Sequence, residues 1–163
     1  MIFTDMQDFT RRSAEGSIVE VMALLDLHDR LLIPPIEKHG GRVVKKIGDA
    51  LMATFDDPLS AVLAAVDAQR ALRDHNRGAP PDRQIRVRIG INAGRVILKE
   101  NDVYGDPVNV ASRVEGLARP EQILITQDVR DLIDEARLKL AALGPQKLKG
   151  KPEPVAVFEV QYA

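Results

Sequence analysis

The feature that most limits the possible folds of this chain is a hairpin pattern at residues 43–55. Two apolar, β-prone runs, VVKKI and ALMATF, are separated by Gly48-Asp49, a pair that favours a tight turn between antiparallel strands. Stretches with helical periodicity lie on both sides of this hairpin. We therefore expect a sheet that contains the hairpin, with helices packed against it.

Periodicity also predicts the order of the other elements. We expect strands at residues 1–5, 85–100, 122–126, 138–143 and 155–162, and helices at residues 17–39, 57–76, 106–118 and 128–136. Ser17 and Asp106 are the expected helix caps, and Pro34-Pro35 is expected to kink or interrupt the first helix. The order βαββαβ, followed by a further helix and strands, predicts an α+β fold with a ferredoxin-like core. In this fold we expect the helices to cover one face of a mostly antiparallel sheet.

Composition limits the class of protein. The 163 residues fit a single domain, residues 1–163, and a net charge of −1 gives no basic field for a nucleic acid. The absence of cysteine excludes disulfides, thiolate zinc sites and a cysteine nucleophile. No apolar run approaches the roughly 20 residues of a membrane span. We expect a cytoplasmic domain without membrane contact, excised from a longer protein that could itself be membrane-anchored.

Two carboxylates are candidates for metal binding. Asp5 ends the first strand, and Asp49 lies at the tip of the hairpin. If these strands are neighbours, both carboxylates reach one edge of the sheet, where Mg²⁺ could bind them together with substrate phosphates. The alternative is that both are ordinary turn residues.

A second group of candidates could bind phosphate. Asn109 and Arg113 are four residues apart on an expected helix, so they share a face and could clamp a phosphoryl group. The KLKGK segment at residues 147–151 could add a lysine. Each also fits ordinary solvated surface, so residue chemistry suggests a metal-dependent phosphate site but no reaction.

The remaining basic residues have no expected role. Arg86, Arg88 and Arg95 fit the outward face of a strand, and the three histidines fall at no metal-ligand spacing.

Five segments, in chain order, resemble the signatures of class III nucleotide cyclase catalytic domains. They are FTDMQDFT, KKIGDALMATF, RIGINAGRV, DVYGDPVNVASRVEG, and KLKGK followed by a strand. The resemblance extends from Met1 to about Val160. It implies a lyase that forms a cyclic nucleotide from a nucleoside triphosphate.

The resemblance also implies a role for particular residues. Asp5 and Asp49, with the Met6 carbonyl, would hold two Mg²⁺ or Mn²⁺ ions. The residues that it places around the nucleotide are Phe9 and Thr10 beside the triphosphate, Lys45 and Asp102 at the base, Asn109 and Arg113 at the transition state, and Lys149 at the phosphates.

The two base residues favour ATP over GTP. Asp102 can accept a hydrogen bond from the adenine N6 amino group, and Lys45 can donate to N1, whereas guanine reverses both polarities. Family members that use GTP commonly carry Glu and Cys instead, and this chain has no Cys. We therefore expect an adenylate cyclase. The alternatives are a guanylate cyclase, a degenerate cyclase-like domain that binds nucleotide and regulates a neighbour, and a ferredoxin-like interaction module.

The resemblance further implies a homodimer with sites at its interface and an N-terminal regulatory or sensor region in the full-length protein. One residue departs from the first signature, because Asp8 stands where the family usually has Gly. Its side chain could weaken ATP binding, raise the metal requirement, or point to solvent.

Overall fold

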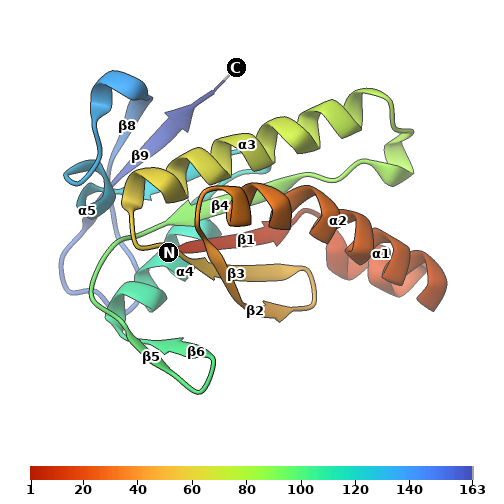
Figure 1. The fold of residues 1–163 in the computed structure, drawn as a ribbon, viewed down its shortest axis with the longest axis horizontal. Helices are drawn as coiled ribbons and strands as arrows, with labels where there is room; N and C mark the ends of the chain where they lie inside the picture. Colours follow the sequence, from red (N-terminus) through yellow and green to blue (C-terminus); the bar gives the residue numbers. More distant parts are fainter. Residues whose placement is uncertain (163) are drawn as a thin grey trace.

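The computed structural model describes residues 1–162, and Ala163, the last residue of the expected domain, lies outside them (Figure 1). Its main feature is a seven-stranded sheet in the order β2-β3-β1-β4-β7-β9-β8. The strands are β1 (Ile2–Met6), β2 (Arg42–Ile47), β3 (Ala50–Thr54), β4 (Val87–Ile91), β7 (Ile123–Thr126), β8 (Lys139–Gln146) and β9 (Val155–Gln161). Among the described pairs in this sheet, β4 and β7 are parallel and the others antiparallel, as expected for a mostly antiparallel sheet.

The first four strands form the expected ferredoxin-like core. They are ordered β2-β3-β1-β4, and the two crossover helices are α2 (Ile18–Lys38) and α3 (Pro58–Arg77). Both helices lie on the same face of the sheet (Figure 1). Ile2 and Met6 of β1 and Val87 of β4 are buried in one cluster with apolar residues of α3, because alternate strand residues point to that face. The α+β prediction is confirmed.

Helix α4 (Asp106–Leu117) covers the other face of the sheet. It lies behind the sheet in Figure 1, whereas α2 and α3 lie in front. Gly90 permits this close packing, since a Cβ atom there would lie 2.3 Å from the backbone nitrogen of Glu115. The expectation that helices cover only one face is therefore wrong, and the face under α4 carries most of the polar residues discussed below.

Local interactions explain where helix α2 begins and why it continues past its two prolines. The Ser17 side chain accepts a hydrogen bond from the Glu20 nitrogen at 3.2 Å and forms a capping box, as its position predicts. The helix continues through Pro34 and Pro35 without a break, contrary to expectation. Leu32 and Ile36, on either side of the prolines, are buried, and this packing holds the last turns in place.

Several shorter elements differ from the predicted boundaries. The described residues contain α1 (Phe9–Glu15), α5 (Gln127–Arg130), two 3₁₀ turns at Pro81–Arg83 and Glu135–Arg137, and a separate hairpin of β5 (Ile97–Lys99) and β6 (Asp102–Tyr104). The strand expected at 85–100 is thus divided, and the helix expected at 128–136 is reduced to single turns. The cap of α4 is Gly105, with φ of 137°, and Asp106 is the first helical residue. Among the described residues, no helix has the length and apolar character needed to cross a membrane.

The contact at Gly90 can be tested by adding one methyl group. Gly90→Ala should lower the free energy of unfolding by about 2 kcal/mol or more, because the Cβ meets the backbone of α4 rather than a flexible side chain. Gly116→Ala, in α4 itself, is the matched control, since no atom lies within 4 Å of its added Cβ. Urea unfolding of both variants makes the comparison, and equal effects would contradict close packing at Gly90.

Candidate active site

Two carboxylates meet at one edge of the sheet. Asp5 is in β1, and Asp49 is in the turn between β2 and β3, where Gly48 has φ of 59°. The Met6 backbone N–H donates a hydrogen bond to Asp49 Oδ2 at 2.8 Å, which fixes the hairpin tip against the end of β1. Burial, and then the neighbouring Asp5 carboxylate, raise the pKa of Asp49 to about 6. The sequence correctly predicted that these two carboxylates come together.

This pair of carboxylates fits a hard divalent cation. Their mutual repulsion, which favours protonation of Asp49, would be relieved by a cation bound between them. Among the described residues, no group of three or more His, Cys, Asp or Glu side chains could hold a metal by itself. Mg²⁺ is commonly bound by one or two carboxylates together with substrate phosphates and water, so Asp5 and Asp49, with the Met6 carbonyl, are the residues that could hold it here.

Arg88 also contacts this cluster. From the sequence we expected it to lie on the outward face of a strand and to have no role. Its Nη2 donates to Asp5 Oδ2 at 2.9 Å, and its Nε forms an ion pair with Glu115 Oε1 at 2.6 Å. Burial raises the pKa of Glu115, and the Arg88 charge opposes that rise. Arg88 is paired with Asp5 in the β1–β4 register, so strand parity could have indicated that both share the face under α4.

Lys45 and Asp102 meet at a second position. Lys45 Nζ of β2 lies 3.2 Å from Asp102 Oδ2 of β6, so the ion pair joins the two hairpins. The backbone N–H of Val103 donates to Asp102 Oδ1 at 2.8 Å. This hydrogen bond, followed by Lys45, lowers the pKa of Asp102. The carboxylate is therefore held ionised as a hydrogen-bond acceptor.

The Lys45–Asp102 pair lines a pocket of about 230 Å³. The rest of the lining is mainly apolar and includes Phe3, Met52 and Val108. Such a pocket, with an apolar surface and one donor beside one acceptor, suits a flat heteroaromatic ring.

Asn109, Arg113 and Lys149 lie on exposed surface. The first two occupy the outer side of α4, whose inner residues Val110 and Val114 are buried against the sheet. No hydrogen bond or ion pair among the described residues joins Asn109 or Arg113 to Asp5 or Asp49. The structure therefore groups the carboxylates, and separately the two residues of α4, without linking the groups within one chain.

The remaining residues predicted for the site lie in the segment that follows β1. Phe9 begins α1 next to the hairpin tip, 3.7 Å from where a Cβ of Gly48 would lie, and Thr10 is exposed. Asp8 has left-handed backbone geometry, with φ of 60°, which explains why Gly suits this position. Its carboxylate lies 3.5 Å from Arg11.

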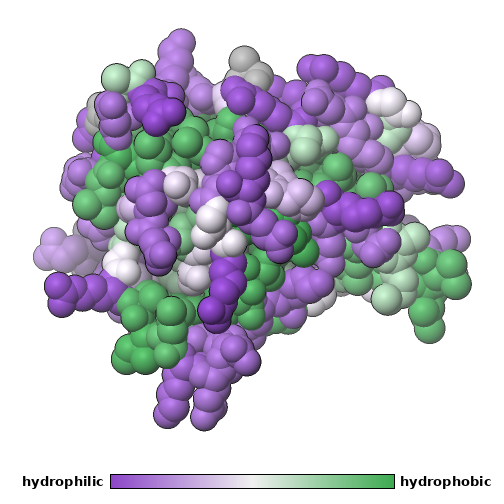
Figure 2. All heavy atoms as spheres, viewed as in Figure 1, coloured by the Kyte–Doolittle hydropathy of each residue, from purple (hydrophilic) through white to green (hydrophobic). Residues whose placement is uncertain are grey.

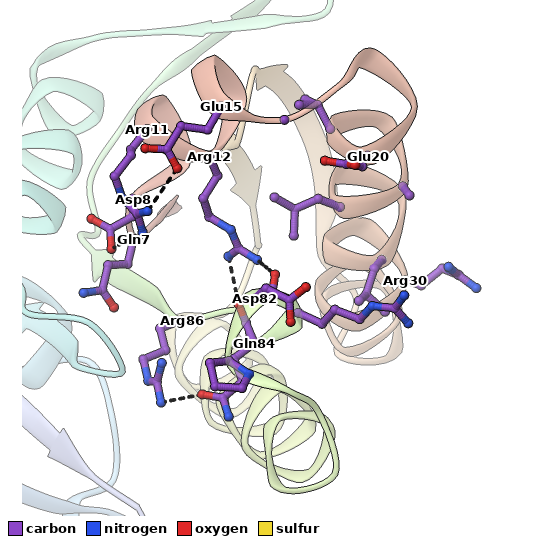
Figure 3. A pocket seen from close by; sticks show the side chains of 17 residues that line it. Gln7, Asp8, Arg11, Arg12, Glu15, Glu20, Arg30, Asp82, Gln84 and Arg86 are labelled. Carbon is purple, nitrogen blue, oxygen red and sulfur yellow. Dashed lines mark hydrogen bonds and ion pairs between the residues drawn. The ribbon is translucent and has the colours of Figure 1, made fainter.

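Asp8 directly precedes α1 and is exposed. It lines a larger pocket, of about 720 Å³, between α1, α2 and residues 81–86 (Figure 3). No residue predicted for the site lines this pocket. The Asp8 side chain is 53% exposed, and its effect on ATP binding or on the metal requirement stays a prediction.

Comparison with known proteins gives matches over the whole domain. The family model of the adenylate and guanylate cyclase catalytic domain matches residues 1–161. An adenylate cyclase of Anabaena cylindrica is 34% identical, over 99% of this chain and 36% of that protein. The serine/threonine-protein kinase pkn2 of Myxococcus xanthus is 32% identical, over 100% of this chain and 20% of that protein. This chain therefore spans well under half the length of these curated relatives.

Solved structures share the fold. An adenylate/guanylate cyclase/hydrolase from Silicibacter pomeroyi has a TM-score of 0.84 at 32% identity, and the match covers 99% of this chain and 95% of that one. The catalytic core of a rhodopsin-guanylyl cyclase with converted specificity, in complex with ATPαS, has a TM-score of 0.86 at 26% identity, with 98% and 93% covered.

The raised pKa of Asp49 predicts a pH-dependent effect on stability. Between pH 3.8 and about 6 the folded protein keeps a proton that the unfolded chain has released, so this carboxyl lowers stability above pH 6 and not below pH 4. Asp49→Asn should raise the free energy of unfolding of the metal-free protein by about 1 kcal/mol at pH 7.5. Urea titrations at pH 7.5 and pH 3.8 measure this, and a gain of equal size at both values would contradict the assignment.

Proposed function

The chain belongs to the adenylate and guanylate cyclase catalytic domain family, and from that premise we propose that it converts ATP to 3′,5′-cyclic AMP and pyrophosphate. The observation that carries the choice of ATP is the Lys45–Asp102 pair in its apolar pocket. The ionised Asp102 accepts from the N6 amino group of adenine, and Lys45 donates to N1. Guanine would place an acceptor against Asp102 and a donor against Lys45, and unpaired polar groups of this kind discriminate strongly.

In this proposal the base pocket belongs to one copy of the chain, and the phosphates extend from it to the carboxylate edge of a second copy. There Asp5, Asp49 and the Met6 carbonyl would hold two Mg²⁺ or Mn²⁺ ions, which supply Lewis-acid stabilisation of the phosphate charge when bound. Phe9 lies beside the hairpin tip, and Phe9 and the adjacent Thr10 would border the triphosphate. The ribose 3′-oxygen forms a bond to the α-phosphorus, the bond from that phosphorus to pyrophosphate breaks, and the hydroxyl proton is released.

Asn109, Arg113 and Lys149 complete the site from the copy that supplies the base pocket. The amide and the guanidinium donate hydrogen bonds to oxygens around the α-phosphorus, whose charge grows as the new bond forms. Lys149 binds the phosphates as a compact charge on its loop.

The separation of the two groups within one chain supports a homodimer. In a two-fold dimer, α4 of one copy can reach the carboxylate edge of the other, and the symmetry makes two equivalent sites. Exposed apolar side chains over the β5–β6 hairpin, visible in the lower left of Figure 2, offer contact surface, since Ile97 and Leu98 are 65% and 60% exposed.

The greater length of the relatives supports a further part of the proposal. The curated relatives are longer than this chain, which fits a full-length protein in which the domain is joined to a regulatory or sensor region. We place the domain itself in the cytoplasm, where ATP is available.

The test is cyclic-nucleotide production from ATP and from GTP with Mn²⁺, measured across a range of protein concentrations. We expect cyclic AMP in excess over cyclic GMP, with a specific activity that rises with concentration because the site needs two copies. Asp49→Ala should abolish the product. Cyclic GMP as the main product would instead identify a guanylate cyclase. A folded protein that binds ATP and forms no product would be a regulatory nucleotide-binding domain.

A further inference from the structure

The loop between β8 and β9 contains a tight turn at residues 148–151. The Lys151 backbone N–H donates to the Leu148 carbonyl at 3.1 Å, and Gly150, in the third position, has φ of 85°. This is the arrangement of a type II turn, which requires positive φ at its third residue. Lys149 occupies the second position and is exposed at the corner of the turn.

Both ends of this turn are attached to α4. Leu148 is 3% exposed and belongs to the buried cluster that contains Val110 and Val114 of that helix. Lys151 Nζ lies 2.7 Å from Asp106 Oδ2, and Asp106 is the first residue of the helix. The corner that carries Lys149 is therefore held at two points on the same helix.

We propose that Asp106 and Lys151 are positioning residues, whose ion pair holds Lys149 in register with Asn109 and Arg113. This inference rests on the proposed function and deepens it. Asn109 and Arg113 lie three and seven residues after Asp106, about 4.5 and 10 Å along the helix axis. The ion pair thus fixes where one phosphate-binding charge stands relative to the two residues that act at the α-phosphorus.

The ion pair contributes to the position of Lys149 and adds little to the free energy of unfolding. The side chains of Lys151 and Asp106 are 32% and 62% exposed, and ion pairs with such exposure typically add less than about 1 kcal/mol. Without the pair, the contact described above that still ties this turn to α4 is the burial of Leu148, and the corner at Lys149 gains freedom to move. A small displacement of a positioned charge is enough to lower the rate of phosphoryl chemistry.

The main rival role for Lys151 is direct binding of phosphate, with Asp106 as a competitor for its charge. The two roles predict opposite results for Asp106→Asn. If Lys151 binds phosphate directly, loss of Asp106 frees it and lowers the KM for ATP. If the pair positions Lys149, loss of Asp106 lowers kcat/KM and has the same effect as loss of Lys151.

The first experiment needs no activity. Trypsin can cleave after Lys149, which is followed by Gly150, so cleavage at that bond reports on the mobility of the turn. Asp106→Asn and Lys151→Met should each increase this cleavage about threefold or more in the protein without nucleotide, with the urea midpoint unchanged. Lys147→Met, an exposed lysine in the same segment, should leave it unchanged. Unchanged cleavage in the Asp106 and Lys151 variants would overturn the inference.

The second experiment compares kinetics. Asp106→Asn, Lys151→Met and the double variant should each lower kcat/KM for ATP about tenfold, with no further loss in the double variant, because one contact is removed in all three. Lys151→Arg keeps the pair and should retain most of the activity, and Lys147→Met should match the unmodified protein. Losses that multiply in the double variant, or a lower KM for Asp106→Asn, would overturn the inference.

The two experiments separate this inference from the proposed function. Absence of any cyclic product from the unmodified protein would overturn the function. The cleavage comparison would still decide whether the ion pair anchors the turn.

Discussion

The close packing of α4 on β4 at Gly90 is the contact on which the rest of the site depends. Because the helix backbone lies directly on the strand, Glu115 can pair with Arg88, and Arg88 can reach Asp5. The same helix carries the two proposed transition-state residues on its outer side, and its first residue holds the Lys151 end of the turn that presents Lys149. A bulkier residue at position 90 would displace all of these groups together.

The charged residues of the site form two separate pairs, one of like charges and one of opposite charges. At the carboxylate edge, Asp5 and Asp49 repel each other, and the ion pair described there joins Arg88 to Asp5, so the edge favours binding of further positive charge. At the base pocket, Lys45 and Asp102 already neutralise each other and offer one donor and one acceptor. The first arrangement suits divalent ions and phosphates, and the second suits a neutral heteroaromatic base.

The sequence predicted those features that depend on local pattern. Apolar periodicity and the Gly48-Asp49 turn were sufficient for the ferredoxin-like core and for bringing Asp49 to Asp5. Periodicity does not indicate which face of a sheet a later helix will cover, so the side taken by α4, and with it the contacts of Arg88 with Asp5 and Glu115, were missed. The left-handed geometry of Asp8 and the capping of α4 by Gly105 depend on single backbone angles, which residue type predicts only weakly.

The measurement that tests the central claim most directly is complementation between two inactive variants, Asp49→Ala and Arg113→Ala. Each lacks one half of every site as a homodimer, whereas a mixed dimer keeps one intact site. An equal mixture should therefore form cyclic AMP at roughly a quarter of the specific activity of the unmodified protein, while neither variant alone forms product. A mixture of folded variants that exchange subunits and still form no product would contradict a site shared between two copies of this chain.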